Sequence, residues 1–445
     1  MTEAPGLTGS RVHWRNWAGN ERAVADVVRP GSVAEVADVL VAAADAGRRV
    51  RPIGCSHSFT AIGAPVDIQL ACDGLVAVGP VADDGLVTVG AGTPLYRLNA
   101  ELLRRGWALT NLGDIDRQTV AGSLATGTHG TGARFGGLAT QVRALELVTV
   151  AGDVLACDAA RHPDVLAVAR VGLGALGVVT SVTLQAVPAF ALRAVEGPGT
   201  LTAALDGFEE LMTATEHVEF YWFPHTDATL VKRNTRVSLE EGLTPLPRWR
   251  VLWDDEVLAN AAFAGVVATG RRVPALVPPL ARISAKALGA RTWTDHAHRV
   301  FVSRRRVRFL EMEYAVPRSE APAVLAELRR VHEANDWRAA FPVEVRLAAA
   351  DDIPLSTASG RDTAYIAAHV PTGTDPGHWF AALESIAGSV GGRPHWGKLH
   401  GLDAEVLRER YPRFGEFVAV RDRLDPSGVL ANPYLDRVLG VAPGR

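Results

Sequence analysis

The chain has 445 residues, of which 48% are apolar and 21% are charged, and its formal net charge is −3. This length predicts two or three domains, each able to bury a core of its own. The small net charge, and the lack of any basic run with interleaved aromatic residues, argue against a nucleic-acid-binding protein. No uninterrupted apolar run reaches membrane-spanning length, so we expect no membrane segment.

Cysteine usage and the first residues predict the compartment. Cys55, Cys72 and Cys157 are too few and too scattered for a disulfide framework. The stretch from Met1 to Ser10 has neither the cationic start nor the apolar centre of a signal peptide. We therefore expect a soluble protein of a reducing cytoplasm.

Residues 24 to 184 alternate between short strand and helix patterns. Ser32 is a typical N-cap residue, and apolar residues at helical spacing follow it as far as Gly47. A glycine turn separates the two strands of a predicted hairpin. In chain order, strands are predicted over 24–28, 50–53, 86–89, 144–150, 154–157 and 177–186, and helices over 32–46, 94–105 and 164–171. The pattern indicates an α+β domain with a mixed sheet, which we place at residues 1–188.

From Pro188 onward the predicted elements become longer. Helices are expected over 203–214, 321–333 and 379–387, and alternating strands over 218–223, 307–316, 343–349 and 363–370. These indicate a second α+β domain with a larger antiparallel sheet, at residues 189–400. The tail, residues 401–445, has the pattern of helix and loop, and we expect it to pack back on the first domain.

The most informative stretch is a loop from Thr119 to Gly130 that alternates glycine with small and hydroxyl residues. Consecutive unobstructed backbone N–H groups of this kind form a concave anion site. Thr126 and Thr128 are candidate donors to phosphate, or else hydroxyls that stabilise the turn. His129 is as good a candidate for a phosphate ligand as for a cap of the turn.

A second turn of small residues surrounds His57. Gly54, Cys55, Ser56 and Ser58 follow a strand and leave room for a bulky planar ligand. A neutral imidazole is a good nucleophile, and a histidine bonded to an isoalloxazine methyl group would fit this turn. The competing interpretation is a buried, hydrogen-bonded histidine at the end of a strand. Together the two segments suggest that the chain binds the pyrophosphate of a large cofactor and holds it near His57.

The string Gly172-Leu-Gly-Ala-Leu-Gly177 matches a dinucleotide-binding fingerprint, but its context does not. That fingerprint needs a strand before the glycines and a helix after them. Here the predicted helix comes first and the strand from Val178 follows. We therefore interpret the glycines as a tight helix-to-strand connection, and a contact between the backbone near Val178 and a flavin edge depends on the family resemblance described below.

Glu344 and Arg346 are two positions apart in a predicted strand, which places both side chains on one face. Val343, Val345 and Leu347 then lie on the other face. Pattern alone favours a solvent-facing ion pair on an amphipathic strand. The functional alternative is a charged pair that faces a cavity and orients a polyhydroxylated substrate.

The segment Pro394-His-Trp-Gly-Lys-Leu-His400 combines two histidines with one of only three lysines in the chain. It is either a packed loop with an exposed lysine or part of a functional site. His395 and His400 do not match the spacing of zinc ligands, and Asp295-His-Ala-His298 is no better, so we expect no metal. The chain has no Gly-x-Ser-x-Gly elbow and no P-loop, which leaves no case for a hydrolase or a nucleotide triphosphatase.

Several short motifs occur together along almost the whole chain. They are Trp14-Arg-Asn-Trp-Ala-Gly19, Gly54 to Ser58, Leu112 to Gly122, Thr126-Gly-Thr-His-Gly130, Glu219-Phe-Tyr-Trp-Phe-Pro-His225, Glu344-Val-Arg346, His395-Trp-Gly-Lys398 and Asn432-Pro-Tyr434. Each motif alone is unspecific, but the combination is highly specific. It resembles the vanillyl-alcohol-oxidase superfamily of flavoproteins, in the branch of L-gulono-1,4-lactone and D-arabinono-1,4-lactone oxidoreductases, with alditol oxidases next.

The resemblance implies a bilobed FAD-binding domain of the vanillyl-alcohol-oxidase type, a substrate-binding cap domain over the flavin, and a tail that returns to the first domain. It implies FAD attached covalently through His57, although Ser56 stands where many lactone enzymes have glycine. By the same correspondence Glu344, Arg346 and Lys398 line the substrate site as catalytic residues. The implied cofactor-binding residues are Gly54, Cys55, Ser56, His57, Ser58, Gly113, Asp114, Thr119, Ala121, Gly122, Ser123, Thr126, Gly127, Thr128, His129, Gly130, Gly177, Val178, His395 and Lys398.

These assignments lead to the hypothesis that the chain oxidises a sugar-1,4-lactone by hydride transfer to flavin N5. Arg346 and Lys398 would stabilise alkoxide character, and Glu344 would hold substrate hydroxyls. Gly113 matches a position where a small residue admits oxygen in this superfamily, which favours an oxidase that forms hydrogen peroxide. Three alternatives stay open: an alditol oxidase acting on a primary alcohol, a lactone dehydrogenase with another electron acceptor, and a non-catalytic flavin- or carbohydrate-binding protein. We expect a monomer or a weak oligomer.

Overall fold

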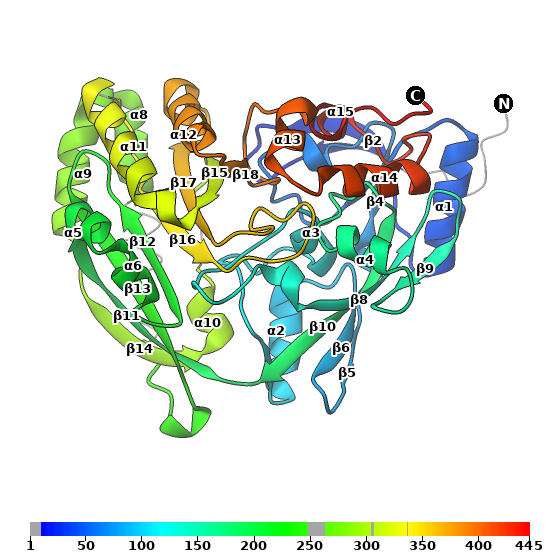
Figure 1. Cartoon of the computed structure of the whole chain (residues 1–445), viewed down its shortest axis with the longest axis horizontal. Helices are drawn as coiled ribbons and strands as arrows, with labels where there is room; N and C mark the ends of the chain where they lie inside the picture. Colours follow the sequence, from blue (N-terminus) through cyan, green and yellow to red (C-terminus); the bar gives the residue numbers. More distant parts are fainter. Residues whose placement is uncertain (1–9, 248–262, 304–306, 336) are drawn as a thin grey trace.

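The computed structural model describes residues 10–247, 263–303, 307–335 and 337–445, which form two lobes side by side (Figure 1). The first lobe contains the N-terminal part of the chain together with the C-terminal helices, and the second lobe, here called the cap, contains the middle part. The segment on which the signal-peptide expectation rests lies outside the described residues, apart from Ser10. Within the described residues, no helix has the length and apolarity needed to cross a bilayer.

The strands of the first lobe form two sheets instead of the one mixed sheet predicted, and the smaller of the two is mixed. Its order is β1 (Ser10–Arg15), β2 (Arg22–Val28), β4 (Ile68–Ala71) and β3 (Val50–Ile53), with β1 antiparallel to β2 and the other pairs parallel. Helix α1 (Val33–Asp45) begins after Ser32, whose hydroxyl accepts a hydrogen bond from the Glu35 amide at 3.2 Å. Its apolar stripe, which includes Val36 and Leu40, packs on this sheet.

The larger sheet of the first lobe is antiparallel. Its order is β5 (Val78–Val81), β6 (Leu86–Gly90), β10 (Val178–Pro188), β8 (Val142–Val148) and β9 (Val154–Cys157), and β7 (Trp107–Leu109) also pairs with β10. The predicted hairpin of β8 and β9 is confirmed, and Gly152 supplies the positive φ of +87° in its turn. Helices α2 (Leu95–Arg104) and α4 (Pro163–Ala169) also match predicted helices.

The glycine-rich stretch is not a loop throughout, which corrects the prediction. Its first half is helix α3 (Val120–Ala125). Thr119 is the N-cap residue, since its hydroxyl accepts a hydrogen bond from the Gly122 amide at 3.2 Å. A threonine cap followed by valine, alanine and leucine is enough to start a helical turn despite the glycine.

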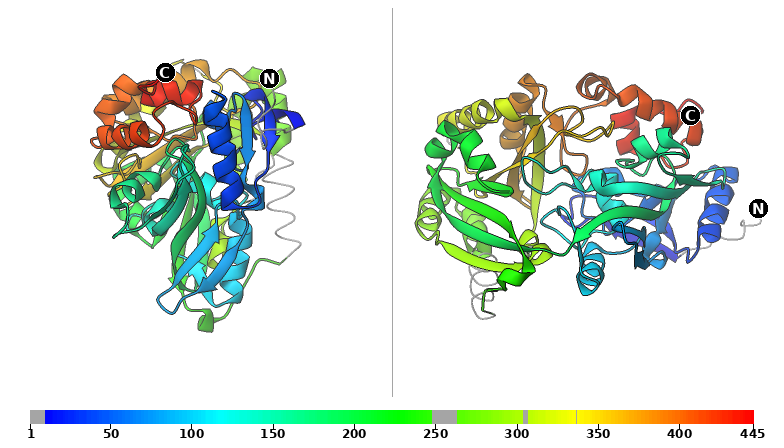
Figure 2. Two further views of the ribbon diagram at one scale, coloured as in Figure 1. Left: turned by 90° about the vertical axis from the view of Figure 1, so that its right-hand side faces the viewer. Right: turned by 60° about the horizontal axis from the view of Figure 1, so that its bottom comes forward.

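The strands in the described part of the cap form one large sheet whose neighbouring strands are all antiparallel, as predicted. β10 leads directly into β11, where the chain enters the cap, and it returns to the first lobe between β18 and α13 (Figures 1 and 2). The order is β14 (Arg291–His296), β11 (Ala191–Thr200), β13 (Ala228–Val237), β12 (His217–Trp222), β16 (Val343–Ala348), β17 (Thr363–Pro371), β15 (Phe309–Pro317) and β18 (Arg393–Pro394). Strands β11 and β13 were not predicted, because Gly197-Pro-Gly199 and the charged residues of β13 obscure the apolar alternation.

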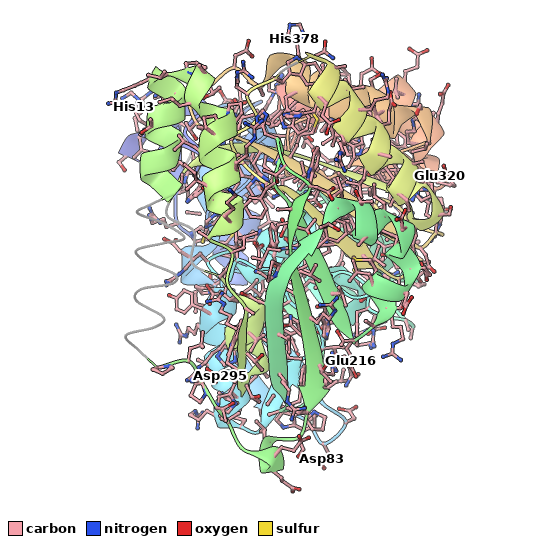
Figure 3. The ribbon with its side chains drawn as sticks, turned by 90° about the vertical axis from the view of Figure 1, so that its left-hand side faces the viewer. His13, Asp83, Glu216, Asp295, Glu320 and His378 are labelled. Carbon is pink, nitrogen blue, oxygen red and sulfur yellow. The ribbon has the colours of Figure 1, made fainter. Side chains whose placement is uncertain are left out.

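Helices cover the outer face of the cap sheet, which Figure 3 shows from the side of the cap, with β14 marked by Asp295 and the start of β12 by Glu216. The prediction of one helix over 203–214 is wrong, because Gly207 lies in a non-helical conformation between two short helices. The cap helices are α5 (Leu201–Asp206), α6 (Phe208–Thr213), α8 (Phe263–Arg272), α9 (Val277–Lys286), α10 (Ala297–Phe301), α11 (Ala321–Asn335) and α12 (Gly377–Ser389). Apolar residues of α5, α6, α11 and α12 form one core with the central strands.

The tail forms helices α13 (Ala404–Arg410), α14 (Phe414–Leu424) and α15 (Pro433–Leu439), whose apolar residues share a core with the larger sheet of the first lobe. Asn432 anchors this arrangement. Its side-chain oxygen caps α15 by accepting from the Leu435 amide at 2.9 Å, and its nitrogen donates to Ala61 O at 2.9 Å and Ala64 O at 3.0 Å. The residue is fully buried, so these contacts fix the tail on the first lobe.

Replacing Asn432 with alanine should therefore destabilise the fold more than the loss of an ordinary helix cap. The variant leaves buried carbonyls without a donor and α15 without its cap, which we expect to cost about 3 kcal/mol. Ser32→Ala is the matched control, because Ser32 is an exposed cap and its loss should cost about 1 kcal/mol. Thermal unfolding of both variants compares the two losses, and equal melting temperatures would contradict the anchoring role.

Candidate active site

Two cavities meet at His57, between the lobes. The first cavity lies within the first lobe, and the second lies between that lobe and the inner face of the cap sheet. His57, Ser58, Gln118 and Thr126 line both of them. A ligand that fills the first cavity can therefore expose one end to the second at this junction.

The walls of the first cavity leave no space for larger side chains. A Cβ atom on Gly54 would lie 2.5 Å from Thr119 Oγ1, and one on Gly122 would lie 2.8 Å from the same atom. Gly177 has a φ of +155°, at the edge of the region that favours glycine. Such a cradle of bare backbone beside a capped helical turn fits the flat ring and diphosphate of the expected FAD.

The residues predicted to bind the cofactor fall into three groups: those that line the first cavity, those that line only the second, and those that line neither. Those that line the first cavity are Gly54, Cys55, Ser56, His57, Ser58, Thr119, Ala121, Gly122, Thr126 and Gly177. Asp114, Thr128, His129, His395 and Lys398 line the second cavity instead. Gly113, Ser123, Gly127, Gly130 and Val178 line neither, and Val178 lies in the core beside α1, while its neighbour Val179 lines the first cavity. The direct cofactor contact predicted for these last residues stays a prediction.

The glycines of 172–177 lie between α4 and β10, so the predicted inverted order, helix first and strand second, is confirmed. Gly172, Gly174 and Gly177 nevertheless line the first cavity. These glycines form part of the cavity wall. They are not followed by the helix N-terminus that a dinucleotide fingerprint requires.

The turn at His57 is held by two tryptophans from the first strand and the loop after it. Ser56 has a φ of +55°, which is unfavourable for a residue with a side chain. Trp14 Nε1 donates to Ser56 Oγ at 2.9 Å, and Trp17 N donates to Ser56 O at 2.8 Å. His57 itself is half-buried, with its ring 6.1 Å from that of Trp17. Burial, followed by the charge of Lys398, lowers the pKa of His57, which favours the neutral, nucleophilic imidazole.

The second cavity has a volume of about 440 Å³, which suits a small polar ligand. One wall is aromatic: Trp17, Phe59 and Phe309 contact one another with ring centroids 5.3 to 6.0 Å apart. Charged residues of strands β15 and β16 and of the loop after β18 line the same cavity, and Phe309 shares its strand with Glu311 and Glu313. A ligand that carries both hydroxyls and C–H groups matches this lining.

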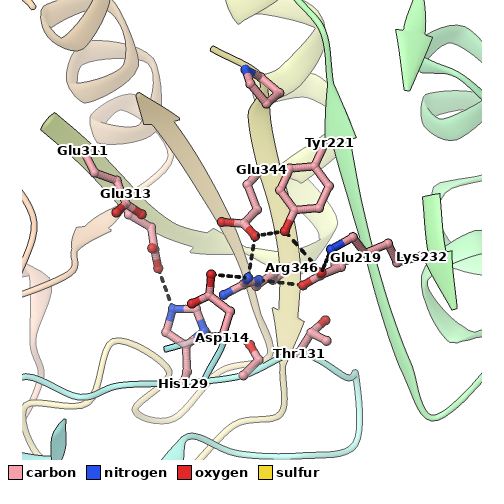
Figure 4. A network of polar contacts seen from close by, with 12 residues as sticks. Asp114, His129, Thr131, Glu219, Tyr221, Lys232, Glu311, Glu313, Glu344 and Arg346 are labelled. Carbon is pink, nitrogen blue, oxygen red and sulfur yellow. Dashed lines mark hydrogen bonds and ion pairs between the residues drawn. The ribbon is translucent and has the colours of Figure 1, made fainter. Parts of the chain in front are cut away.

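Glu344 and Arg346 on β16 point into this cavity and are 4% and 7% exposed, so the solvent-facing interpretation is wrong. The strand is central in the sheet, and helices cover its other face, so both of its faces are buried. Arg346 lies 2.5 Å from Glu344 Oε1, 2.8 Å from Glu219 Oε2 and 3.5 Å from Asp114 Oδ2 (Figure 4). Burial alone would lower the pKa of Arg346, but these carboxylates raise it well above its usual value.

Glu311 and Glu313 on β15 are cavity residues that the sequence analysis missed. They repeat the spacing of Glu344 and Arg346, two positions apart in a strand, and both are buried. Glu311 forms an ion pair with Lys398. The signal that could have found them is this second charged pair in an otherwise apolar strand, Phe309-Leu-Glu-Met-Glu-Tyr314.

His129 is engaged by protein groups on both ring nitrogens. Nδ1 lies 2.9 Å from Gly130 O, and Nε2 lies 2.5 Å from Glu313 Oε1 (Figure 4). Its ring stacks on Tyr365 at 3.5 Å between centroids. Burial alone would raise the pKa of Glu313, but His129, His395 and Lys398 outweigh burial and lower it to about 2. This arrangement leaves no ring nitrogen for phosphate, so of the two hypotheses for His129 the structure supports only the protein contact.

Lys398 is not an exposed loop lysine, since its ammonium contacts Glu311 and lies 5.0 Å from the centre of the Phe59 ring. His395 is buried behind it, and burial lowers the pKa of His395 to about 4. Glu311, Glu344 and His369 come within 4.8 Å of one another, as metal ligands do. Lys398 and Arg346 already neutralise the two carboxylates, so we assign no metal to this group.

Comparisons with known proteins agree with this architecture. Residues 182–438 match the family model described as D-arabinono-1,4-lactone oxidase, and residues 24–158 match an FAD binding domain. The L-gulono-1,4-lactone dehydrogenase of Mycobacterium tuberculosis is 42% identical over 96% of this chain and 99% of its own length. The L-gulonolactone oxidase of Bos taurus is 34% identical over 96% and 98%. The crystal structure of cholesterol oxidase from Brevibacterium sterolicum has the same fold, with a TM-score of 0.79, 17% identity and 97% of each chain covered.

The first cavity lies largely within the part of the chain that matches the FAD-binding model, and Glu311, Glu344, Arg346 and Lys398 lie within the part that matches the oxidase model. The two matches therefore cover the two meeting cavities, which together form the candidate active site. The chain belongs to the D-arabinono-1,4-lactone oxidase family and is an FAD-dependent oxidoreductase that acts on a CH–OH donor.

Proposed function

We propose that the protein oxidises a sugar-1,4-lactone of the L-gulono-1,4-lactone type, with FAD attached covalently through His57. The observation that carries the proposal is the junction at His57, where the cradle for the cofactor opens onto a cavity with two carboxylate–cation pairs. The names of the bacterial and mammalian relatives support the substrate class. Bound FAD would supply the two-electron acceptor for the carbinol hydrogen.

In this proposal Arg346 and Lys398 stabilise negative charge on the reacting hydroxyl oxygen. Both cations face the cavity beside carboxylates, which fixes their positions before the substrate arrives. Glu344 binds substrate hydroxyls and receives the hydroxyl proton. Its carboxylate lies beside Arg346, which in this proposal contacts the reacting hydroxyl oxygen, so it is the proton acceptor next to that oxygen. The aromatic side chains of Trp17, Phe59 and Phe309 exclude water from part of the ligand surface.

The same proposal includes oxygen as electron acceptor, with hydrogen peroxide as product. Gly113 supports it, because a Cβ there would lie 2.9 Å from Thr128 Cγ2 and 3.3 Å from His129 O, so alanine would crowd the second cavity's wall. The mycobacterial relative is named a dehydrogenase, which makes a different electron acceptor the second candidate.

We further propose that the protein works in the cytoplasm as a monomer or weak oligomer, in agreement with its three free cysteines.

Neutralising either cation should slow the chemical step. Arg346→Met and Lys398→Met should each lower the rate of flavin reduction by L-gulono-1,4-lactone about 10²- to 10³-fold, because charge on the hydroxyl oxygen loses a partner. Bound FAD should stay unchanged. Anaerobic stopped-flow absorbance measures the rate, with Lys286→Met on the exposed side of α9 as control. Normal reduction rates in both cavity variants would refute the assignment.

A covalent bond between His57 and FAD predicts that the yellow flavin colour stays with the protein after acid precipitation. FAD should remain with acid-precipitated protein and should be released by acid from His57→Ala. Cys55→Ala is the matched control, since Cys55 is an exposed thiol two residues away in the same cavity and could be an attachment point. Colour that survives in His57→Ala but is lost in Cys55→Ala would move the bond to the thiol.

Oxygen access can be tested at Gly113. Gly113→Ala should reduce reoxidation by oxygen about tenfold or more and leave reduction by substrate intact. The added methyl group takes up space but leaves the charges that act on the substrate unchanged. The double variant Gly113→Ala, Thr128→Ser removes the methyl group that the new Cβ would strike. Recovery of the oxygen rate in the double variant would show that the new methyl group acts by displacing Thr128, and an unchanged oxygen rate in Gly113→Ala would refute the hypothesis.

A further inference from the structure

A row of charges with alternating sign crosses the cap sheet and ends at the active site. Each member faces the next across a pair of strands: Arg291 faces Glu196, Glu196 faces Lys232, Lys232 faces Glu219, and Glu219 faces Arg346. The polar atoms of successive members are 2.5, 3.7, 3.3 and 2.8 Å apart. Figure 3 shows the strands that carry the outer part of this row, between Asp295 on β14 and Glu216 before β12.

The cations in the outer part of the row are more exposed than Arg346. The side chains of Lys232 and Arg291 are 21% and 22% exposed, against 8% for Arg346, whereas Glu196 between them is 7% exposed. The row therefore runs from a buried end at Arg346 to a half-exposed cation at the edge strand β14.

Tyr221 connects the second cavity to this row. Its hydroxyl oxygen lies 2.5 Å from Glu344 Oε1 and 3.2 Å from Glu219 Oε1 (Figure 4). A phenol has one proton, so between two ionised carboxylates it can donate to only one of them. Both contacts become hydrogen bonds once Glu344 is protonated, because Glu344 then donates to the phenol while the phenol donates to Glu219. The geometry is that of a relay which forms when Glu344 receives a proton.

A third cavity lies on the other side of Glu219. It is lined by Asp114, Glu196, Glu219, Lys232, Asn234 and Arg346, among others. Asp114 and Arg346 also line the second cavity, whereas Glu344 and Tyr221 do not line the third. Its volume of about 20 Å³ is enough for one water molecule, and the lining offers several hydrogen-bond partners. A proton that reaches Glu219 can therefore pass to water outside the substrate cavity.

We propose that Tyr221 and Glu219 carry the substrate's hydroxyl proton out of the active site, along the charged row toward Lys232. This inference rests on the proposed function. When the alcohol is oxidised, the carbinol C–H bond breaks and its electron pair leaves with the hydrogen to bound FAD. The O–H bond breaks as the C=O bond forms, and its proton goes to Glu344. The Glu344 proton then moves to the Tyr221 oxygen as the Tyr221 proton moves to Glu219, and Glu219 releases it to water in the third cavity. One proton is moved, and both relay residues return to their starting state.

The charges beside Glu219 suit it to accept a proton briefly. Burial alone would raise the pKa of Glu219, but Arg346 and Lys232 outweigh burial and lower it. Burial likewise would lower the pKa of Lys232, but Glu219 and Glu196 raise it above its usual value. Glu219 is thus ionised at rest, ready to accept, and passes the proton on without retaining it.

The experiment compares two signals from the holoenzyme in one anaerobic stopped-flow mixing with L-gulono-1,4-lactone. Flavin absorbance reports reduction, and a pH indicator in weakly buffered solution reports proton release. Tyr221→Phe removes the hydroxyl and keeps the ring, over which the Lys232 ammonium lies at 4.9 Å. Glu219→Gln keeps an oxygen that can accept from Arg346 but cannot take a proton. Tyr314→Phe is the matched control, because it removes a hydroxyl that donates to Glu384 at the same 2.5 Å outside the active site.

In the parent protein and in Tyr314→Phe, proton release should keep pace with flavin reduction. In Tyr221→Phe and Glu219→Gln it should lag about tenfold or more, with a larger solvent deuterium isotope effect and unchanged FAD content. Proton release that keeps pace in both relay variants would overturn the proposal and favour exit through the mouth of the second cavity. A parent protein whose flavin no lactone reduces would instead refute the proposed function.

Discussion

The structure depends on burying the Arg346 guanidinium in the middle of a large sheet. A charge in that position is stable only when carboxylates surround it, and removing a partner from such a buried group costs about 3 to 5 kcal/mol. Glu344, Glu219 and Asp114 are those partners, and they come from β16, from β12 and from the first lobe. One cation therefore fixes the register of two strands and the approach of the two lobes. The polar inner face of the cap sheet follows from this requirement.

The first lobe brings a complementary surface to that polar face. Trp14 and Trp17 hold Ser56 in an unfavourable conformation and so present His57 at the junction of the two cavities. Strain of this kind persists only where surrounding contacts determine the conformation, and it occurs most often at functional sites. Asn432 fastens the tail behind the same lobe. The geometry of the candidate site thus depends on residues from both ends of the chain as well as its middle.

Sequence patterns predicted the local features well. The capped helix at Ser32, the hairpin around Gly152, the inverted order at Gly177 and the shared face of Glu344 and Arg346 all follow from periodicity and turn chemistry. The partners of those residues could not be predicted in this way. Glu219 lies 127 positions from Arg346 in sequence, and only the strand order of the folded sheet brings them together. The burial of Glu344 and Arg346 was predicted wrongly for the same reason. A strand with alternating polar and apolar residues has the same pattern whether its polar face meets water or a charged cavity.

A crystal structure of the holoenzyme with a bound lactone analogue tests the central claim most directly. The account predicts density that is continuous from the His57 ring to the FAD ring system, the diphosphate beside Gly54 and Gly122, and the analogue in the second cavity with an oxygen between Arg346 and Lys398. An analogue bound elsewhere, or FAD that lies outside the first cavity, would contradict it.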